Sequence, residues 1–137
     1  MHTTPSLAQT QPAFSTAGAL WLKLAVLYLI VGVGLGIMMG ASEDFTMRPV
    51  HAHINLLGWA TMAVAGLVYS VFPQAAASKL AKAHFWLHNI SLPVMAVSLA
   101  FVIGGQRGLI PVLAFSEIVA ALGILVFAAN IFLNLKK

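Results

Sequence analysis

Polar and apolar positions divide the chain into four long apolar runs separated by short polar stretches. The runs cover residues 17–40, 49–72, 83–105 and 108–135. Each exceeds the roughly 20 residues that a helix needs to cross a bilayer core of about 30 Å. Because main-chain groups in lipid must hydrogen-bond internally, we expect four membrane-spanning helices.

The connections between the runs are short and cover residues 41–48, 74–82 and 106–107. Helices joined by short connections run antiparallel. The pattern therefore predicts an all-α integral membrane protein, with a four-helix transmembrane bundle of up-down-up-down topology over residues 17–137. Residues 1–16 are polar and contain two prolines but no Lys or Arg, so we expect a flexible cytoplasmic tail.

Composition excludes several classes of protein. Hydrophobic residues make up 61% of the chain and charged residues 7%, against about 45–50% and about 25% in soluble domains. So few charges could not cover the surface of a soluble enzyme, and a disordered chain would not be this apolar. The sequence has no cysteine. Disulfides and thiolate metal sites are therefore excluded, and a bound metal or haem would need His, Met or carboxylate ligands.

The cations divide unequally between the two ends of the predicted bundle. Arg48 and Arg107 lie at one end, with Glu43 and Asp44, whereas the other end carries Lys23, Lys79, Lys82, Lys136 and Lys137. The positive-inside rule then predicts that both termini are cytoplasmic in a bacterial-type inner membrane. Cations spread over membrane ends do not form a nucleic-acid-binding patch, so lipid rather than nucleic acid is the expected partner.

Small residues form a ridge on the first predicted helix. Gly32, Gly36 and Gly40 follow a GxxxGxxxG pattern, which allows another helix to approach closely. The ridge is equally compatible with packing inside one chain and with contact between subunits.

Two histidines mark the start of the second run, within the segment Arg48-Pro-Val-His51-Ala-His53-Ile-Asn55. Polar groups in a membrane helix are costly and suggest a functional site. On a regular helix His51 and His53 point about 200° apart, so they would serve sites on opposite sides. His51 and Asn55 share a face, so Asn55 could orient the imidazole or bond a neighbouring helix. The alternative is that both histidines bond lipid headgroups or water.

The third run contains a second histidine pair, His84 and His88, with the spacing of ligands on one helix face. They are candidates for a second metal or cofactor site, although a helix near the membrane interface would show the same pattern. Counting from opposite membrane faces places His53 and His88 about 15 Å or more apart in depth. We therefore do not expect them to ligate the same metal.

Glu117 is the carboxylate within the fourth run. Its expected depth is close to that of His53, and an unpaired carboxyl group inside a membrane is expected to be protonated. Glu117 is therefore a candidate proton-relay residue beside the histidines. The alternative is a neutral carboxyl group that bonds a main-chain carbonyl or Ser116.

A copper or zinc site is a second interpretation of the same region. His51, His53, Glu43 and Asp44 could together form an outward-facing site in a metal-trafficking or assembly protein, and nearby methionines are compatible with copper. A third interpretation is a structural membrane subunit whose histidines only bond their neighbours.

Residues 48–73 resemble subunit I of the haem–copper oxidases, including the nitric oxide reductases. An early helix in that superfamily begins with Arg-x-x-His or His-x-Asn-Leu-Leu, where the histidine ligates a low-spin haem. Arg48-Pro-Val-His51 and His53-Ile-Asn55-Leu-Leu match these two elements. A later family helix has His-x-His, an apolar run containing glycine, and an aromatic residue shortly before Phe-Pro. The segment from His51 through Gly66 and Tyr69 to Phe72-Pro73 is similar to it.

The resemblance implies a small relative that binds haem b through His53, with His51 as alternative or second ligand and Arg48 and Asn55 nearby. It implies electron transfer, which requires a redox partner, or binding of a gas such as O2 or NO. The copper-site histidine pair and a complete proton-channel pattern of the oxidases are not found, so enzymatic turnover is not implied. Subunit I consists of three pseudo-equivalent arcs of four helices, and this chain has the helix count of one arc. The resemblance therefore implies a homotrimer.

Overall fold

The computed structural model describes residues 15–135, which are helical and contain no strand. In chain order the elements are α1 (Thr16–Ser42), α2 (Arg48–His53), the π-helix η1 (Ile54–Thr61), α3 (Met62–Val71), α4 (Pro73–Ala76), α5 (Lys79–Ile103), the 3₁₀ turn η2 (Arg107–Leu109) and α6 (Ile110–Asn134).

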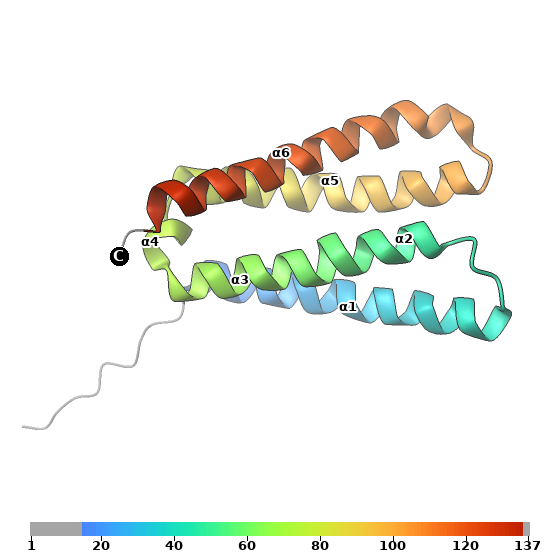
Figure 1. Ribbon diagram of the computed structural model, residues 1–137, viewed down its shortest axis with the longest axis horizontal. Helices are drawn as coiled ribbons and strands as arrows, with labels where there is room; N and C mark the ends of the chain where they lie inside the picture. Colours follow the sequence, from blue (N-terminus) through green and yellow to red (C-terminus); the bar gives the residue numbers. More distant parts are fainter. Residues whose placement is uncertain (1–14, 136–137) are drawn as a thin grey trace, which may run out of the picture.

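Four helical segments within the described residues are long and apolar enough to cross a membrane: α1, the continuous run α2–η1–α3, α5, and η2–α6. Consecutive segments run antiparallel (Figure 1). They form two hairpins, one of α1 with α2–η1–α3 and one of α5 with α6. We call the end of the bundle that holds α4 the α4 end, and the opposite end, with the connections 43–47 and 104–106, the loop end.

Two helix boundaries differ from the sequence expectation because serine residues cap the helices. The Ser78 hydroxyl accepts a hydrogen bond from the Ala81 amide, and α5 begins at Lys79 rather than at residue 83. The expected connection 74–82 is consequently largely helical. The Ser15 hydroxyl likewise accepts from the amide of Gly18 at the start of α1. The last two residues of the predicted tail, residues 15 and 16, therefore belong to the start of α1. Residues 1–14 of the predicted tail lie outside the described residues.

Glycines allow α1 to lie directly against the second spanning segment. A Cβ atom on Gly18 would lie 2.7 Å from the carbonyl oxygen of Gly66. A Cβ on Gly58 would lie 2.6 Å from the Tyr28 ring. Small residues thus bring the two helices of the first hairpin into backbone contact.

The three glycines of the predicted ridge differ in their surroundings: two pack against the second spanning segment, and the third does not. A Cβ on Gly32 would lie 2.5 Å from the amide group of Asn55, and one on Gly36 would lie 3.1 Å from Cε1 of His51. A Cβ on Gly40 would meet open space. Of the two uses that the sequence allows, Gly32 and Gly36 therefore serve packing within the chain.

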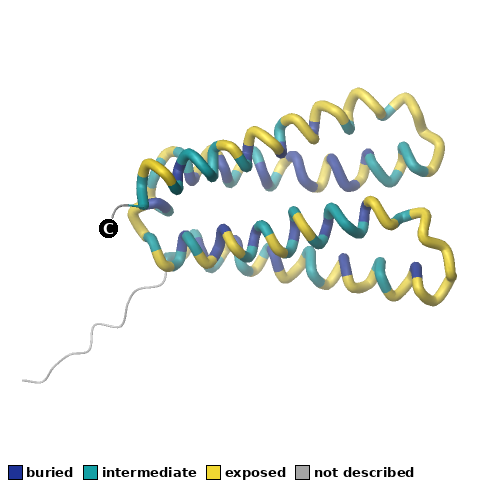
Figure 2. Tube along the Cα trace, in the orientation of Figure 1, coloured by how far each residue is buried: buried dark blue, intermediate teal, exposed yellow. Residues whose placement is uncertain are grey.

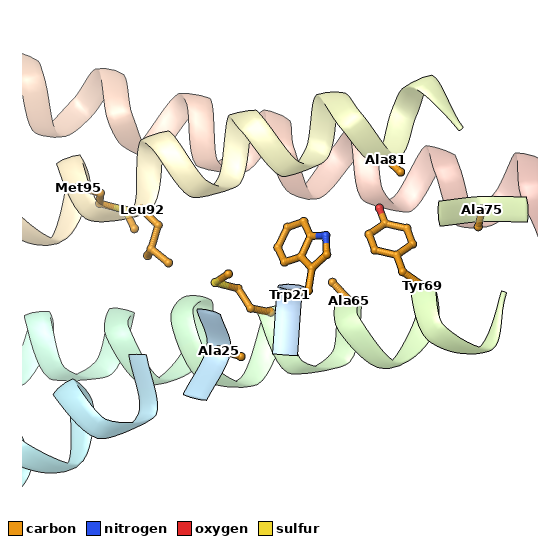
Figure 3. Close-up of a cluster of buried hydrophobic side chains, with 9 residues drawn as sticks. Trp21, Ala25, Ala65, Tyr69, Ala75, Ala81, Leu92 and Met95 are labelled. Atoms are coloured by element: carbon orange, nitrogen blue, oxygen red, sulfur yellow. The ribbon is translucent and has the colours of Figure 1, made fainter. Parts of the chain in front are cut away.

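The two hairpins meet at a core of large side chains. Trp21 of α1 and Tyr69 of α3 project toward the second hairpin, where Leu92 and Met95 of α5 extend the core toward the loop end (Figure 3). Buried positions face the space between the hairpins, whereas the outer faces are exposed (Figure 2). Those outer faces are apolar: Ile37, Phe115 and Phe132 are 67%, 69% and 86% exposed. Such a surface suits lipid rather than water.

We predict that Gly18→Leu lowers the thermal unfolding temperature of the purified protein in detergent. The added side chain must displace the Gly66 backbone, and overpacking of this kind costs about 1–3 kcal/mol. Gly34→Leu is the matched control, because a Cβ there meets open space. Tryptophan fluorescence during heating measures both variants, and equal unfolding temperatures for the two would contradict the glycine contact between α1 and α3.

Candidate functional site

His51 points into its own bundle. Its Nδ1 lies 2.9 Å from the carbonyl oxygen of Gly32 in α1. Because a carbonyl only accepts, Nδ1 carries the ring proton and Nε2 has the lone pair. The ring also lies beside Gly36. The divergence of the two histidines was predicted, but His51 is directed at α1 of the same chain rather than at a pocket on the flank of the bundle.

Asn55 reinforces this arrangement one turn later. Its Nδ2 donates to the carbonyl oxygen of His51 at 2.8 Å. The same nitrogen is 3.3 Å from His51 Nδ1, but that ring atom already donates its proton to Gly32 and cannot accept. Asn55 therefore packs against α1 and holds the backbone of His51, instead of orienting the imidazole through its ring nitrogen.

His53 faces the flank of the bundle and is half-buried. Its Nδ1 lies 2.7 Å from the carbonyl oxygen of Pro49, in the first turn of α2. Nδ1 is again the protonated nitrogen, which leaves the Nε2 lone pair available. The side chain lines two hollows of about 260 Å³ each, and apart from His53 the lining residues are mostly apolar: Ala52, Leu56 and Leu57 in one, and Leu57, Met95, Glu117, Ala120, Ala121 and Ile124 in the other.

Glu117 shares one of these hollows with His53, as their similar predicted depth requires. Its side chain is nevertheless exposed at the mouth of this hollow. The hydroxyl of neighbouring Ser116 donates to the Leu113 carbonyl at 2.7 Å and not to Glu117. In a membrane, this position places a carboxyl group at the flank of the bundle, beside an imidazole.

A π-helical segment, η1, begins directly after His53. The sequence had led us to expect a regular α-helix at this position. The Thr61 hydroxyl donates to the carbonyl of Leu56, five residues earlier, at 2.8 Å. π-Segments are rare and frequently occur at functional sites. No local residue pattern predicted η1, because contacts with other helices support its π-helical hydrogen bonds.

His84 and His88 are buried in the core of the bundle, at 0% and 1% exposure. The His84 ring stacks between Trp21 and Phe127, with centroid distances of 4.5 and 4.8 Å. Trp86 on the same helix is 61% exposed. The physical reason is that α5 turns this histidine face toward the first hairpin.

The His88 ring reaches the second spanning segment. Its Nε2 donates to the carbonyl of Leu57 at 3.0 Å, within η1. Leu57 follows His53 by one turn, or about 6 Å along a helix. The depth separation of His53 and His88 is therefore smaller than the sequence estimate, because α5 starts earlier than expected and the ring extends across the interface. His88 Nε2 is occupied by this bond.

A polar network at the α4 end was not found from the sequence. Asn130 is fully buried and donates to the Ala75 carbonyl at 3.1 Å and to the Tyr69 hydroxyl at 3.3 Å. Its oxygen accepts from Ser78 and Asn134. The Tyr69 oxygen is also 2.9 Å from Nδ1 of His84. An asparagine inside the apolar fourth run was the available indication.

The loop residues of the proposed outward-facing metal site have separate structural roles. Asp44 accepts from the Thr46 amide at 2.9 Å, and hydrogen bonds from Thr46 hold the pKa of Asp44 below its usual range. Glu43 occupies a left-handed conformation at the end of α1, with φ of 56°. The Arg48 guanidinium lies 5.4 Å from the centre of the Phe45 ring. Within residues 15–135, no group of three or more His, Asp or Glu side chains is placed to hold a metal ion.

Comparison with protein-family models, with curated proteins and with solved structures finds no match for this chain.

Proposed function

We propose that this chain is a membrane protein that binds haem b through Nε2 of His53, for electron transfer or for binding of a gas such as O2 or NO. The observation that carries the proposal is the hydrogen bonding and surroundings of the His53 ring. Its Nδ1–H is held by the Pro49 carbonyl, and its side chain borders two largely apolar hollows. A ligating histidine generally has its second ring N–H held by a carbonyl or carboxylate in this way.

The residues around His53 fit a haem. The hollow walls are apolar, and the Arg48 guanidinium at the loop end is a suitable partner for the carboxylate groups of the cofactor. His51 is the less favourable ligand, since its ring lies against Gly36 inside the bundle. When bound, the haem would supply one-electron chemistry or a gas-binding iron, and its potential would depend on the ligating side chain and on local polarity.

The membrane setting follows from the four apolar helices and their charge distribution. Lys23, Lys79 and Lys82 lie toward the α4 end, whereas Arg48 and Arg107 lie at the loop end. By the positive-inside rule, the α4 end with both termini would face the cytoplasm of a bacterial-type inner membrane. His53 would then lie in the outer part of the membrane.

One subunit does not enclose a large ligand at His53. Pockets that hold drug-sized ligands measure about 300–1,000 Å³, and each hollow here is smaller. The exposed Glu117 beside His53 is also costly on a lipid-facing surface. A second copy would cover both and could supply a further ligand to the cofactor. Together with the helix count of one oxidase arc, this favours a homotrimer.

Removal of the ligand tests the proposal directly. We expect His53→Ala to lose most of the haem when the protein is purified from a haem-replete membrane, whereas His88→Ala retains more than half. The reason is that His88 donates its Nε2–H to Leu57 and is buried. Haem per protein is measured by its absorption spectrum. Equal haem content in the two variants would refute ligation by His53.

A second prediction concerns Glu117. Because Glu117 lines the same hollow as His53, we expect its carboxyl group to respond when a cofactor held by His53 changes its redox state. Redox-induced infrared difference spectra should therefore show a carboxyl band that disappears in Glu117→Gln, with folding unchanged. Glu43→Gln in the loop is the control. A spectrum insensitive to Glu117→Gln would remove Glu117 from proton-coupled chemistry.

A third prediction concerns assembly. Native mass spectrometry in mild detergent is expected to give a trimer, because the site at His53 is incomplete in one copy. A monomer that retains one haem per chain would show that a single subunit encloses the cofactor, and the trimer would then be wrong.

A further inference from the structure

A hollow of about 210 Å³ lies at the α4 end, at the opposite end of the bundle from His53. Its walls come from α1, α3, α4 and α5, so both hairpins contribute to it. Most of the wall is apolar. The side chains in the wall that carry polar atoms are Trp21, Tyr69, Lys82 and Trp86.

The indole N–H of Trp21 is a buried donor that points into this hollow. Trp21 is 2% exposed, and the nitrogen edge of its ring faces Tyr69 and Ala81, which both line the hollow (Figure 3). The hydrogen bonds here join Asn130 to Tyr69 and Tyr69 to His84, and none in the described part of the chain uses the Trp21 N–H. Because a buried indole N–H usually has a partner, the hollow lacks an acceptor that a ligand would supply.

Lys82 adds a positive charge at the rim of the hollow, where its side chain is exposed. The protein has three acidic side chains, and all three belong to the described part of the chain. Glu43 and Asp44 follow α1 at the loop end, and Glu117 lines the hollow of His53. Lys82 therefore has no acidic side chain to pair with. Since an ammonium group and an indole N–H only donate, the hollow suits an anion that accepts hydrogen bonds.

The two donors lie at different depths in the bundle. Both α1 and α5 begin at the α4 end (Figure 1). Trp21 lies five residues beyond the start of α1 and Lys82 three residues beyond the start of α5, or roughly 7.5 Å and 4.5 Å along the helices. A lysine side chain also extends toward the membrane surface. The cation is therefore the outer donor and the indole the inner one, as the phosphate of a phospholipid lies outside its ester carbonyls.

We propose that this hollow binds one anionic phospholipid, with its phosphate at Lys82 and an ester carbonyl at the indole N–H of Trp21. Basic pockets between transmembrane helices on the cytoplasmic side bind anionic headgroups. The hollow is smaller than a whole phospholipid, so the acyl chains continue outside it along Leu20 and Trp86, which are 46% and 61% exposed. The lipid joins the two hairpins, because Trp21 belongs to the first and Lys82 to the second.

Native mass spectrometry of the full-length protein in an uncharged detergent tests the contact at Lys82. Lys82→Ala is expected to weaken binding of phosphatidylglycerol about fivefold relative to Lys79→Ala, which is the effect of one cation beside an anionic headgroup. Lys79 is the matched control, because it is exposed on the same helix but does not line the hollow. Equal binding by the two variants, or wild-type binding of phosphatidylcholine as strong as that of phosphatidylglycerol, would overturn the proposal.

The indole resonances of nitrogen-15-labelled wild-type protein test the inner contact. Titration with phosphatidylglycerol is expected to move the Trp21 signal and to leave that of Trp59, which lies in η1 outside the hollow, unchanged. Spectra of Trp21→Phe and Trp59→Phe assign the two signals. A stationary Trp21 signal, or the same movement with inorganic phosphate alone, would refute a phospholipid site.

The inference uses the membrane orientation proposed above but not the haem at His53. His53→Ala is expected to bind phosphatidylglycerol as the wild type does, because His53 does not line this hollow. Loss of lipid binding in a protein that retains haem would therefore count against the lipid site alone. Loss of haem in a protein that retains the lipid would support its independence from His53.

Discussion

Each histidine N–H in this apolar bundle needs an acceptor, and main-chain carbonyls supply it for three of the four described rings. His51 donates to Gly32, His53 to Pro49 and His88 to Leu57. A carbonyl can only accept, so each bond determines which ring nitrogen keeps a lone pair. The chemistry available to each histidine follows from this constraint: Nε2 is available on His51 and His53, and Nδ1 on His88.

The same bonds hold the helices together. The carbonyl of Gly32 is reached because glycine at that position leaves room for the His51–Asn55 face. The bond from His88 to Leu57 joins the two hairpins within the π segment η1. Trp21 completes the joint by packing on both His84 and His88. The same residues therefore pack the helices together and hydrogen-bond the buried polar groups.

The protein has two polar regions of different character. His84 and His88 are buried in the core. A hydrogen bond between His84 and Tyr69 connects the pair to Asn130 at the α4 end. His53 and Glu117 lie at the flank, where a ligand or another copy can reach them. Leu57 borders both regions, through its carbonyl on one side and the wall of the hollow on the other.

The sequence by itself determined the four apolar helices and their antiparallel order, because hydropathy and run length are local properties. Helical periodicity also predicted that His51 and His53 diverge, and the rise per residue predicted that Glu117 lies at a depth close to that of His53. Tertiary structure decided the burial of His84 and His88, the π segment and the free nitrogen of each ring. Those properties depend on acceptors far away in the chain, 19 residues from His51 at Gly32 and 31 residues from His88 at Leu57. Such partners are set by helix packing, which the order of apolar and polar residues along one helix does not specify.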